Sequence, residues 1–64
     1  MKVIPIELLD VGDFLWVEYF NEFLKVKDIL QNKNNDFAVT DYFGRTFYFM
    51  KKTEIQIRWK KKKK

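Results

Sequence analysis

The 64-residue sequence contains no cysteine, no histidine and no serine. Disulfide bridges are therefore excluded, and so are zinc sites of the kind that cysteine and histidine build. An enzyme made from this chain would lack the commonest proton shuttle and the most nucleophilic side chain, and no imidazole is present to activate the remaining hydroxyl groups. We expect a protein that is not an enzyme and that holds no metal ion or cofactor.

Glycine and proline are scarce: the chain has two glycines and one proline. Gly12 and Gly44 are isolated, so the sequence contains no glycine-rich loop that could hold a phosphate group. Asp10 and Asp13 flank the first of these glycines and could bind Mg²⁺ as a carboxylate pair. We favour a structural role, in which both residues shape the Val11–Gly12 turn by accepting hydrogen bonds from its backbone amides.

Long apolar runs are absent as well. No stretch approaches the roughly 20 residues that a membrane-spanning helix needs. The N-terminus, M-K-V-I-P-I-E-L-L-D, is a poor signal peptide because Pro5 and an acidic residue interrupt its apolar part. We therefore expect a cytoplasmic protein without a membrane partner.

The net charge of +4 comes from one end of the chain. Residues 60–64 supply five of the 13 basic residues, and the other eight stand against nine acidic residues, which leaves the body with a net charge of −1. Within this body, residues 1–22 are acidic and residues 23–59 are mildly basic. We expect one domain over residues 1–59 and a disordered basic tail over residues 60–64.

Aromatic residues, in contrast, are abundant at 19% of the chain. A domain this small buries little surface, and each aromatic ring adds a large buried area. We expect a dense aromatic core to replace the missing disulfides. The alternative is a homo-oligomer whose interface completes the core.

Apolar and polar residues alternate with a period of two once the chain passes Asp13. Five short segments carry this pattern, at residues 14–20, 24–30, 37–41, 46–50 and 54–59, with turn-forming residues between them. The pattern predicts an all-β fold, a small barrel or sandwich. A helix over residues 17–30 is the alternative, and Pro5 indicates an edge strand or an extended arm before the first of the five strands. The residues expected in the core are Leu15, Val17, Leu24, Val26, Phe37, Val39, Phe47, Phe49, Ile55 and Ile57.

Two motifs carry a resemblance at the level of the fold. The stretch L-L-D-V-G-D-F-L-W-V resembles the entry to an SH3-like barrel, where an acidic glycine turn precedes a core strand. The hairpin V-T-D-Y-F-G-R-T-F-Y-F is similar to those of KOW-type small barrels. The resemblance covers residues 3–59 and implies a single small SH3-like barrel of five strands. Proteins of that class often bind RNA, DNA or peptides, and the fold does not choose among these ligands.

The outward face of the expected strands carries aromatic and basic side chains together, which suits single-stranded nucleic acid. Bases stack on aromatic rings at roughly 1–3 kcal/mol each, while cations hold the phosphates. A lysine tail adds affinity without sequence preference. The residues expected to bind single-stranded DNA or RNA are Trp16, Lys25, Lys27, Arg45, Tyr48, Arg58, Lys60, Lys61 and Lys62.

Two other interpretations use the same residues. Trp16 and Phe20 could belong to the core, with Lys25 and Lys27 as a solvated surface that protects an edge strand. Alternatively, the aromatic residues dock on a protein, because Trp, Tyr and Arg are enriched at binding hot spots. The acidic residues of positions 10–22 would then meet a basic partner. This suits a small regulator, of the kind that phages encode, which modulates a larger host protein.

Overall fold

The alternating residues form antiparallel strands in the computed structural model, which describes residues 2–58. The all-β prediction is confirmed, and the helical alternative for residues 17–30 is wrong because the longest strand lies there. Six strands are present where the pattern indicated five. The elements are β1 (Lys2–Pro5), the 3₁₀ helix η1 (Ile6–Leu8), β2 (Phe14–Val17), β3 (Glu22–Gln31), β4 (Phe37–Asp41), β5 (Thr46–Phe49) and β6 (Glu54–Ile57). The tail predicted at residues 60–64 lies outside the described residues.

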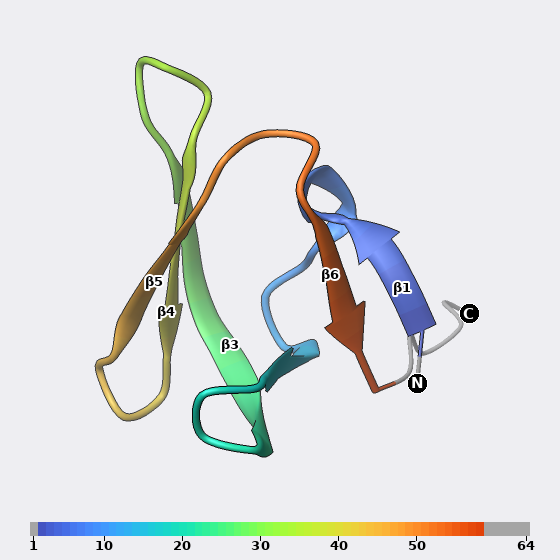
Figure 1. Cartoon of the computed structure of the whole chain (residues 1–64). Helices are drawn as coiled ribbons and strands as arrows, with labels where there is room; N and C mark the ends of the chain where they lie inside the picture. The colour runs from blue at the N-terminus through green and yellow to red at the C-terminus, as the bar shows by residue number, and fades with distance from the viewer. Residues whose placement is uncertain (1, 59–64) are drawn as a thin grey trace, which may run out of the picture.

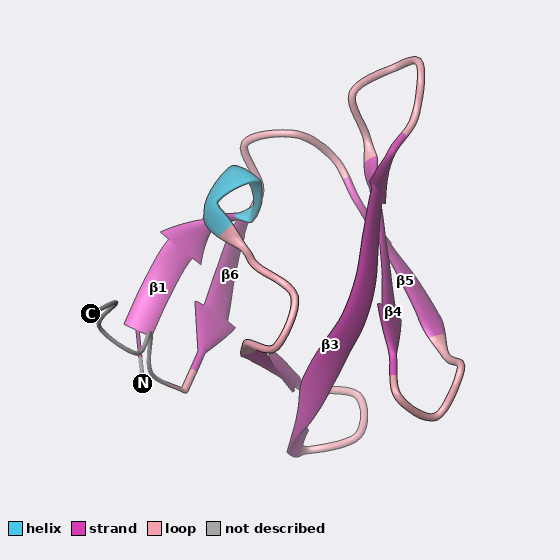
Figure 2. Cartoon of the chain, turned by 180° about the vertical axis from the view of Figure 1, so that it is seen from behind, coloured by secondary structure: helices cyan, strands magenta, loops and turns pink. Residues whose placement is uncertain are grey.

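The strands form one antiparallel sheet in the order β1-β6-β2-β3-β4-β5 (Figure 1). Strand β3 belongs to both halves of the sheet, since its first residues pair with β2 and its later residues with β4. A register shift between Val26 and Asp28 marks the change. Seen from behind, β1 and β6 lie on one side of β3, and β4 and β5 lie on the other (Figure 2). Within residues 2–58, β1 and β5 are the two edges, and each pairs with one neighbour.

The additional strand is β1, which Pro5 indicated as an edge strand. It pairs with β6 from Lys2, opposite Ile57, to Pro5, opposite Glu54. The chain then turns through η1, where the backbone N–H of Ile6 donates to the carbonyl of Thr53 at 2.7 Å. Proline is tolerated at this position because β1 is an edge strand, where the missing N–H breaks no bond to β6. The 3₁₀ helix η1, which has three residues, is the only helix among residues 2–58. No helix in this part of the chain is long enough to cross a membrane.

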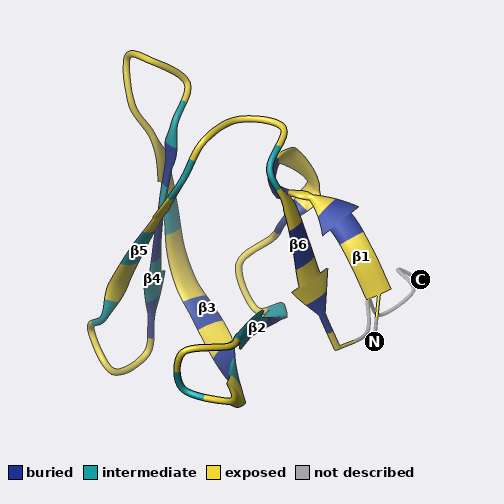
Figure 3. Cartoon of the chain, viewed as in Figure 1, coloured by how far each residue is buried: buried dark blue, intermediate teal, exposed yellow. Residues whose placement is uncertain are grey.

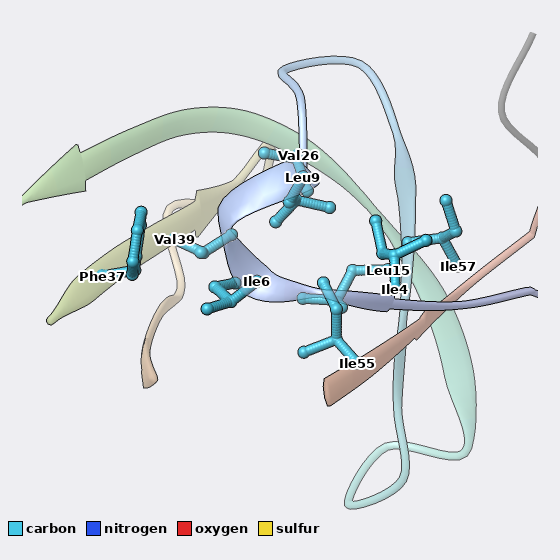
Figure 4. Packing of buried hydrophobic residues seen from close by; sticks show 9 residues of the cluster. All are labelled: Ile4, Ile6, Leu9, Leu15, Val26, Phe37, Val39, Ile55 and Ile57. Carbon is cyan, nitrogen blue, oxygen red and sulfur yellow. The ribbon is translucent and has the colours of Figure 1, made fainter. Parts of the chain in front are cut away.

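Buried positions lie on β1, β3, β4 and β6, among other elements (Figure 3). The core that they form is aliphatic rather than aromatic (Figure 4). Seven of the ten predicted core residues are buried, and Val17, Phe47 and Phe49 are half-buried. Three aliphatic residues from the N-terminal segment complete the core and were not predicted. The buried apolar residues are Ile4, Ile6, Leu9, Leu15, Leu24, Val26, Phe37, Val39, Ile55 and Ile57.

The expectation of a dense aromatic core is therefore wrong. Of the eleven aromatic residues within positions 2–58, Phe37 alone is buried. The pleat of the strands explains this result, because successive side chains point to opposite faces. Strand β2 shows the effect: Leu15 is almost fully buried at 1% exposure, while its neighbours Phe14 and Trp16 face outward and are half-buried. The rings are surface groups, and their surroundings decide what they can bind.

Candidate nucleic-acid interface

The pairing of β2 with β3 assembles an outward-facing cluster. Phe14 lies opposite Lys25, and Trp16 lies opposite Phe23. Side chains of directly opposed residues sit close enough to interact on one face of an antiparallel pair. The rings of Trp16 and Phe23 meet edge to face, with their centroids 5.0 Å apart and an interplanar angle of 64°. This geometry places an aromatic pair, Trp16 and Phe23, next to a ring–cation pair, Phe14 and Lys25, on one surface.

Arg58 joins the cluster from β6. Its backbone N–H donates to the carbonyl of Phe14 at 3.0 Å, which continues the pairing of β6 with β2. The guanidinium carbon lies 5.0 Å from the ring centroid of Phe14 and 6.0 Å from that of Phe23. The Lys25 ammonium lies 5.9 Å from the same Phe14 centroid. Two cations thus flank one ring. We call this surface the basic aromatic face: Phe14, Trp16, Phe23, Lys25 and Arg58.

The exposure of these residues suits binding. Lys25 and Arg58 are exposed, while the three rings are half-buried and are held by their neighbours. A cation within about 6 Å of a ring centroid gains roughly 0.5–1 kcal/mol at an exposed site, so it stays near the ring but can also reach a ligand. Tyr42, from the turn between β4 and β5, borders this surface, with its ring centroid 5.5 Å from the Lys25 ammonium. Lys27 is exposed two positions further along β3, at the register shift between Val26 and Asp28.

Arg45 has a different environment from Lys25 and Arg58. Its Nε donates to Oδ2 of Asp41 at 2.8 Å, and the Asp41 carboxylate is buried at 3% side-chain exposure. The guanidinium carbon also lies 4.4 Å from the ring centroid of Phe20 and 5.0 Å from that of Phe43. Because its charge is neutralised and its guanidinium group lies close to two rings, Arg45 stabilises the turn at residues 41–45.

The Asp41 carboxylate organises this turn. Its Oδ1 accepts hydrogen bonds from the backbone N–H groups of Phe43 and Arg45, both at 2.9 Å. Burial acts to raise the pKa of Asp41, but the hydrogen bonds from Arg45 and Phe43 and the positive charge of Arg45 outweigh it, so the pKa lies below its ordinary value of 3.8. Gly44 supplies the left-handed backbone that the turn requires, at φ +85°. Asp41 therefore remains ionised at neutral pH.

Tyr48 projects from β5, where its side chain is 75% exposed opposite Ala38. It does not pair with any strand that carries the basic aromatic face. An open groove of about 470 Å³ nevertheless links the two regions, because Trp16, Val17 and Glu18 line one side of it and residues 46–49 of β5 line the other. Trp16 belongs to both surfaces.

Among the predicted site residues, then, the structure brings together Trp16, Lys25 and Arg58. Arg45 lies in the neighbouring turn, Tyr48 lies across the groove, and Lys60, Lys61 and Lys62 lie outside the described residues. Phe14, Phe23 and Tyr42 were not among the predicted site residues. Phe14 shares the outward parity of Trp16 and could have been found on that basis. Phe23 could not, because its place depends on the register of β3 against β2.

The two aspartates at the first glycine turn are joined to each other by two hydrogen bonds. Oδ2 of Asp13 accepts a hydrogen bond from the backbone N–H of Asp10 at 2.9 Å, and the N–H of Asp13 donates to the carbonyl of Asp10 at 3.1 Å. The N–H of Gly12 donates to the carbonyl of Val26, which fastens the turn to β3. Over residues 2–58, no group of three or more carboxylates is placed to hold a metal ion.

No model of a known protein family matches the chain, and no curated protein or solved structure is significantly similar to it. Its function must therefore be argued from the geometry of its own residues.

Proposed function

We propose that this protein is a cytoplasmic, non-enzymatic binder of single-stranded nucleic acid that uses the basic aromatic face. The observation that carries the proposal is the position of Lys25 and Arg58 on either side of the Phe14 ring, next to the Trp16–Phe23 pair. A single strand presents unpaired bases and phosphates at close spacing. Rings that accept stacked bases and cations that hold phosphates are the two elements of such sites.

The energetic contributions follow from this arrangement. Each stacked base is worth roughly 1–3 kcal/mol, and the face offers three rings, Phe14 and the Trp16–Phe23 pair. Each phosphate contact releases counterions, so added salt weakens binding. The body has a net charge of −1, and residues 60–64 add five positive charges. Long-range attraction therefore comes from the tail, whereas selectivity for unpaired bases comes from the face.

The proposed fold is consistent with this function. We infer an SH3-like small barrel, because the long strand β3 contributes to both halves of the sheet and β1 pairs beside β6 at one edge. In such a fold the basic aromatic face is a rigid platform on paired strands rather than on loops. Binding sites on paired strands keep their geometry better than sites on mobile segments.

The test is fluorescence anisotropy with labelled single-stranded DNA, single-stranded RNA and duplex DNA at two salt concentrations. We expect the chain truncated after Trp59 to bind single strands in preference to duplex, and Lys25→Gln or Arg58→Gln to weaken that binding several-fold. Lys33→Gln is the matched control, because it removes the same charge from the exposed turn between β3 and β4. The proposal is overturned if all three variants behave alike, or if binding disappears entirely when residues 60–64 are removed.

Docking on a protein is a second candidate function, and the exposure of rings in the two turns beside the basic aromatic face favours it. Tyr19 is 89% exposed and Phe43 is 82% exposed, in the two turns that lie side by side in Figures 1 and 2. Glu22 lines a small hollow with Phe43 and Arg45. Such a surface suits a small regulator of a larger protein, for example one encoded by a phage. Capture of one partner at moderate salt, with loss in Phe43→Ala, would support this function.

A further inference from the structure

The two edges of the sheet differ in their protection against pairing with another chain. Edge strand β1 carries Lys2 and Pro5, and both residue types discourage a further strand. Edge strand β5 reads T-F-Y-F, with no charge and no proline. Its register with β4 runs without a bulge from Thr46, opposite Thr40, to Phe49, opposite Phe37. An exposed, regular and uncharged edge is a template for strand addition.

The hydrogen-bonding pattern shows which backbone N–H and C=O groups of β5 can pair with a further strand. The backbone N–H of Asp41 donates to the carbonyl of Arg45 at 2.9 Å, so this pair is hydrogen-bonded. Hydrogen-bonded and non-hydrogen-bonded pairs alternate along an antiparallel ladder. It follows that Phe47 and Phe49 bond to β4, while Thr46 and Tyr48 direct their N–H and C=O groups to the open side. The close approach of the Thr40 and Thr46 hydroxyls, at 3.2 Å, fits a non-hydrogen-bonded pair.

The space beside this edge can accept another strand. The groove of about 470 Å³ runs along residues 46–49 and is bounded on its far side by Trp16, Val17 and Glu18. Phe47 and Phe49 are half-buried on the groove side of the strand, and Tyr48 and Met50 are 75% and 70% exposed. Apolar side chains from an added strand would cover these groups on both faces of the sheet.

The charges at the two ends of β5 indicate which strand would pair with this edge. Near the start of β5, Glu18 lines the groove with Thr46, and Glu22 lies by Phe43. The Arg45 side chain at this end is neutralised by Asp41, and the Lys25 ammonium lies 5.5 Å from the ring centroid of Tyr42 on the side of the basic aromatic face. Just past the end of β5, Lys51 and Lys52 are exposed. A second copy that pairs antiparallel to β5 would place its basic end against the acidic end of the first copy, twice by symmetry. A parallel copy would oppose like charges.

We propose that this protein forms a two-fold symmetric dimer through antiparallel pairing of β5 with β5 of a second copy. The edge itself is four residues long, so the interface depends on the side chains around it. An aromatic side chain contributes about 150–250 Å² when buried, and a stable interface needs about 800 Å² from each partner. Tyr48, Met50, Phe43 and the half-buried pair on β5 supply an area near the lower limit, which predicts a dimer that dissociates on dilution.

Sedimentation equilibrium on the full chain without nucleic acid tests this proposal. We expect the mass to rise from 7.9 kDa to twice that value as the protein concentration increases toward about 1 mM. Tyr48→Lys should prevent the rise, because it puts two like charges at the centre of the interface. The matched control is Val3→Lys on the opposite edge strand, where the side chain is 54% exposed, and it should leave the dimer intact.

A charge exchange separates this dimer from unspecific association. Glu18→Lys and Lys51→Glu should each weaken the dimer about tenfold or more, and the double variant should recover most of the loss because the two charges attract again across the two-fold axis. A chain that stays monomeric near 1 mM overturns the proposal and leaves the edge for a strand of another protein. Equal effects of Tyr48→Lys and Val3→Lys, or no recovery in the double variant, also overturn it. None of these outcomes depends on nucleic-acid binding.

Discussion

Replacing Asp41 with Asn should destabilise the protein strongly although it changes few atoms. Asp41 is buried and its carboxylate accepts three hydrogen bonds, two from backbone N–H groups and one from Arg45. Asparagine can keep the two backbone bonds through its carbonyl oxygen, but its NH₂ group would then face the Arg45 Nε, where two donors meet. Hydrogen bonds to charged groups contribute about 1.5–3 kcal/mol each, and breaking a buried ion pair costs about 3–5 kcal/mol.

The Arg45 side chain is 33% exposed, so water can replace part of the ion-pair interaction that Arg45 loses in Asp41→Asn. We therefore expect a loss of about 2–4 kcal/mol in the free energy of unfolding. A domain of this size has a total stability of roughly 3–10 kcal/mol, so the loss is a large share. Urea denaturation followed by tryptophan fluorescence measures it. Asp28→Asn is the control, because Asp28 is exposed on β3 and should change stability by about 0.5 kcal/mol or less.

The stabilisation that Asp41 provides, measured against Asp41→Asn, should depend on pH. The pKa of Asp41 is lower in the folded protein than its ordinary value of 3.8, so the unfolded chain binds the proton more tightly. The stabilisation is fully present above the unfolded pKa and is lost as the pH falls through the folded pKa. The difference in unfolding free energy between wild type and Asp41→Asn should thus shrink as the pH falls below about 4. A difference that stays constant between pH 3 and 7, or that equals the Asp28→Asn effect, would refute this account of the turn.

Two further substitutions test the packing and the backbone. Ile57→Ala should destabilise the fold by about 2–5 kcal/mol in the same assay. The reason is that Ile57 is 0% exposed and lies opposite both Lys2 on β1 and Leu15 on β2. A loss below about 1 kcal/mol would contradict the central position of Ile57 in the core. Gly44→Ala should cost about 1–2 kcal/mol through backbone strain alone, because φ is +85° and no atom lies within 4 Å of the added Cβ. Gly44→Asn should recover part of that loss, since Asn tolerates the left-handed region better than Ala.

The sequence predicted the strands better than it predicted the function of their two faces. A period of two identifies which residues share a face, and it correctly separated Leu15 and Leu24 from Trp16 and Lys25. It failed before Asp13, because Ile4, Ile6 and Leu9 enter the core from a short edge strand and a 3₁₀ turn, where no alternation is sustained. Composition misled us about the core. A count of aromatic residues carries no information about which face of a strand they occupy.

The candidate site shows the same limit. Parity placed Trp16, Lys25 and Arg58 on outward faces, but only strand register brings them together around Phe14 and Phe23. Arg45 illustrates the opposite case. Arg45 was expected to bind nucleic acid, but the buried Asp41 four residues earlier neutralises its charge. Local sequence shows that two charges can meet in a turn, but their burial depends on the packing of that turn against Phe20, which is distant in sequence.

The aromatic rings lie mostly at the surface, and this position favours ligand binding, rather than solubility alone, as the reason for the high aromatic content. Aliphatic residues almost alone fill the core, and ten of the eleven aromatic residues within positions 2–58 keep some contact with solvent. Exposed apolar surface promotes aggregation and is normally kept small unless a ligand or partner covers it. Here the rings near Lys25 and Arg58 are interleaved with cations, whereas those along β5 border an uncharged strand edge. The first arrangement suits bases and phosphates, and the second suits another strand, so one small sheet offers two surfaces of different chemistry that meet at Trp16.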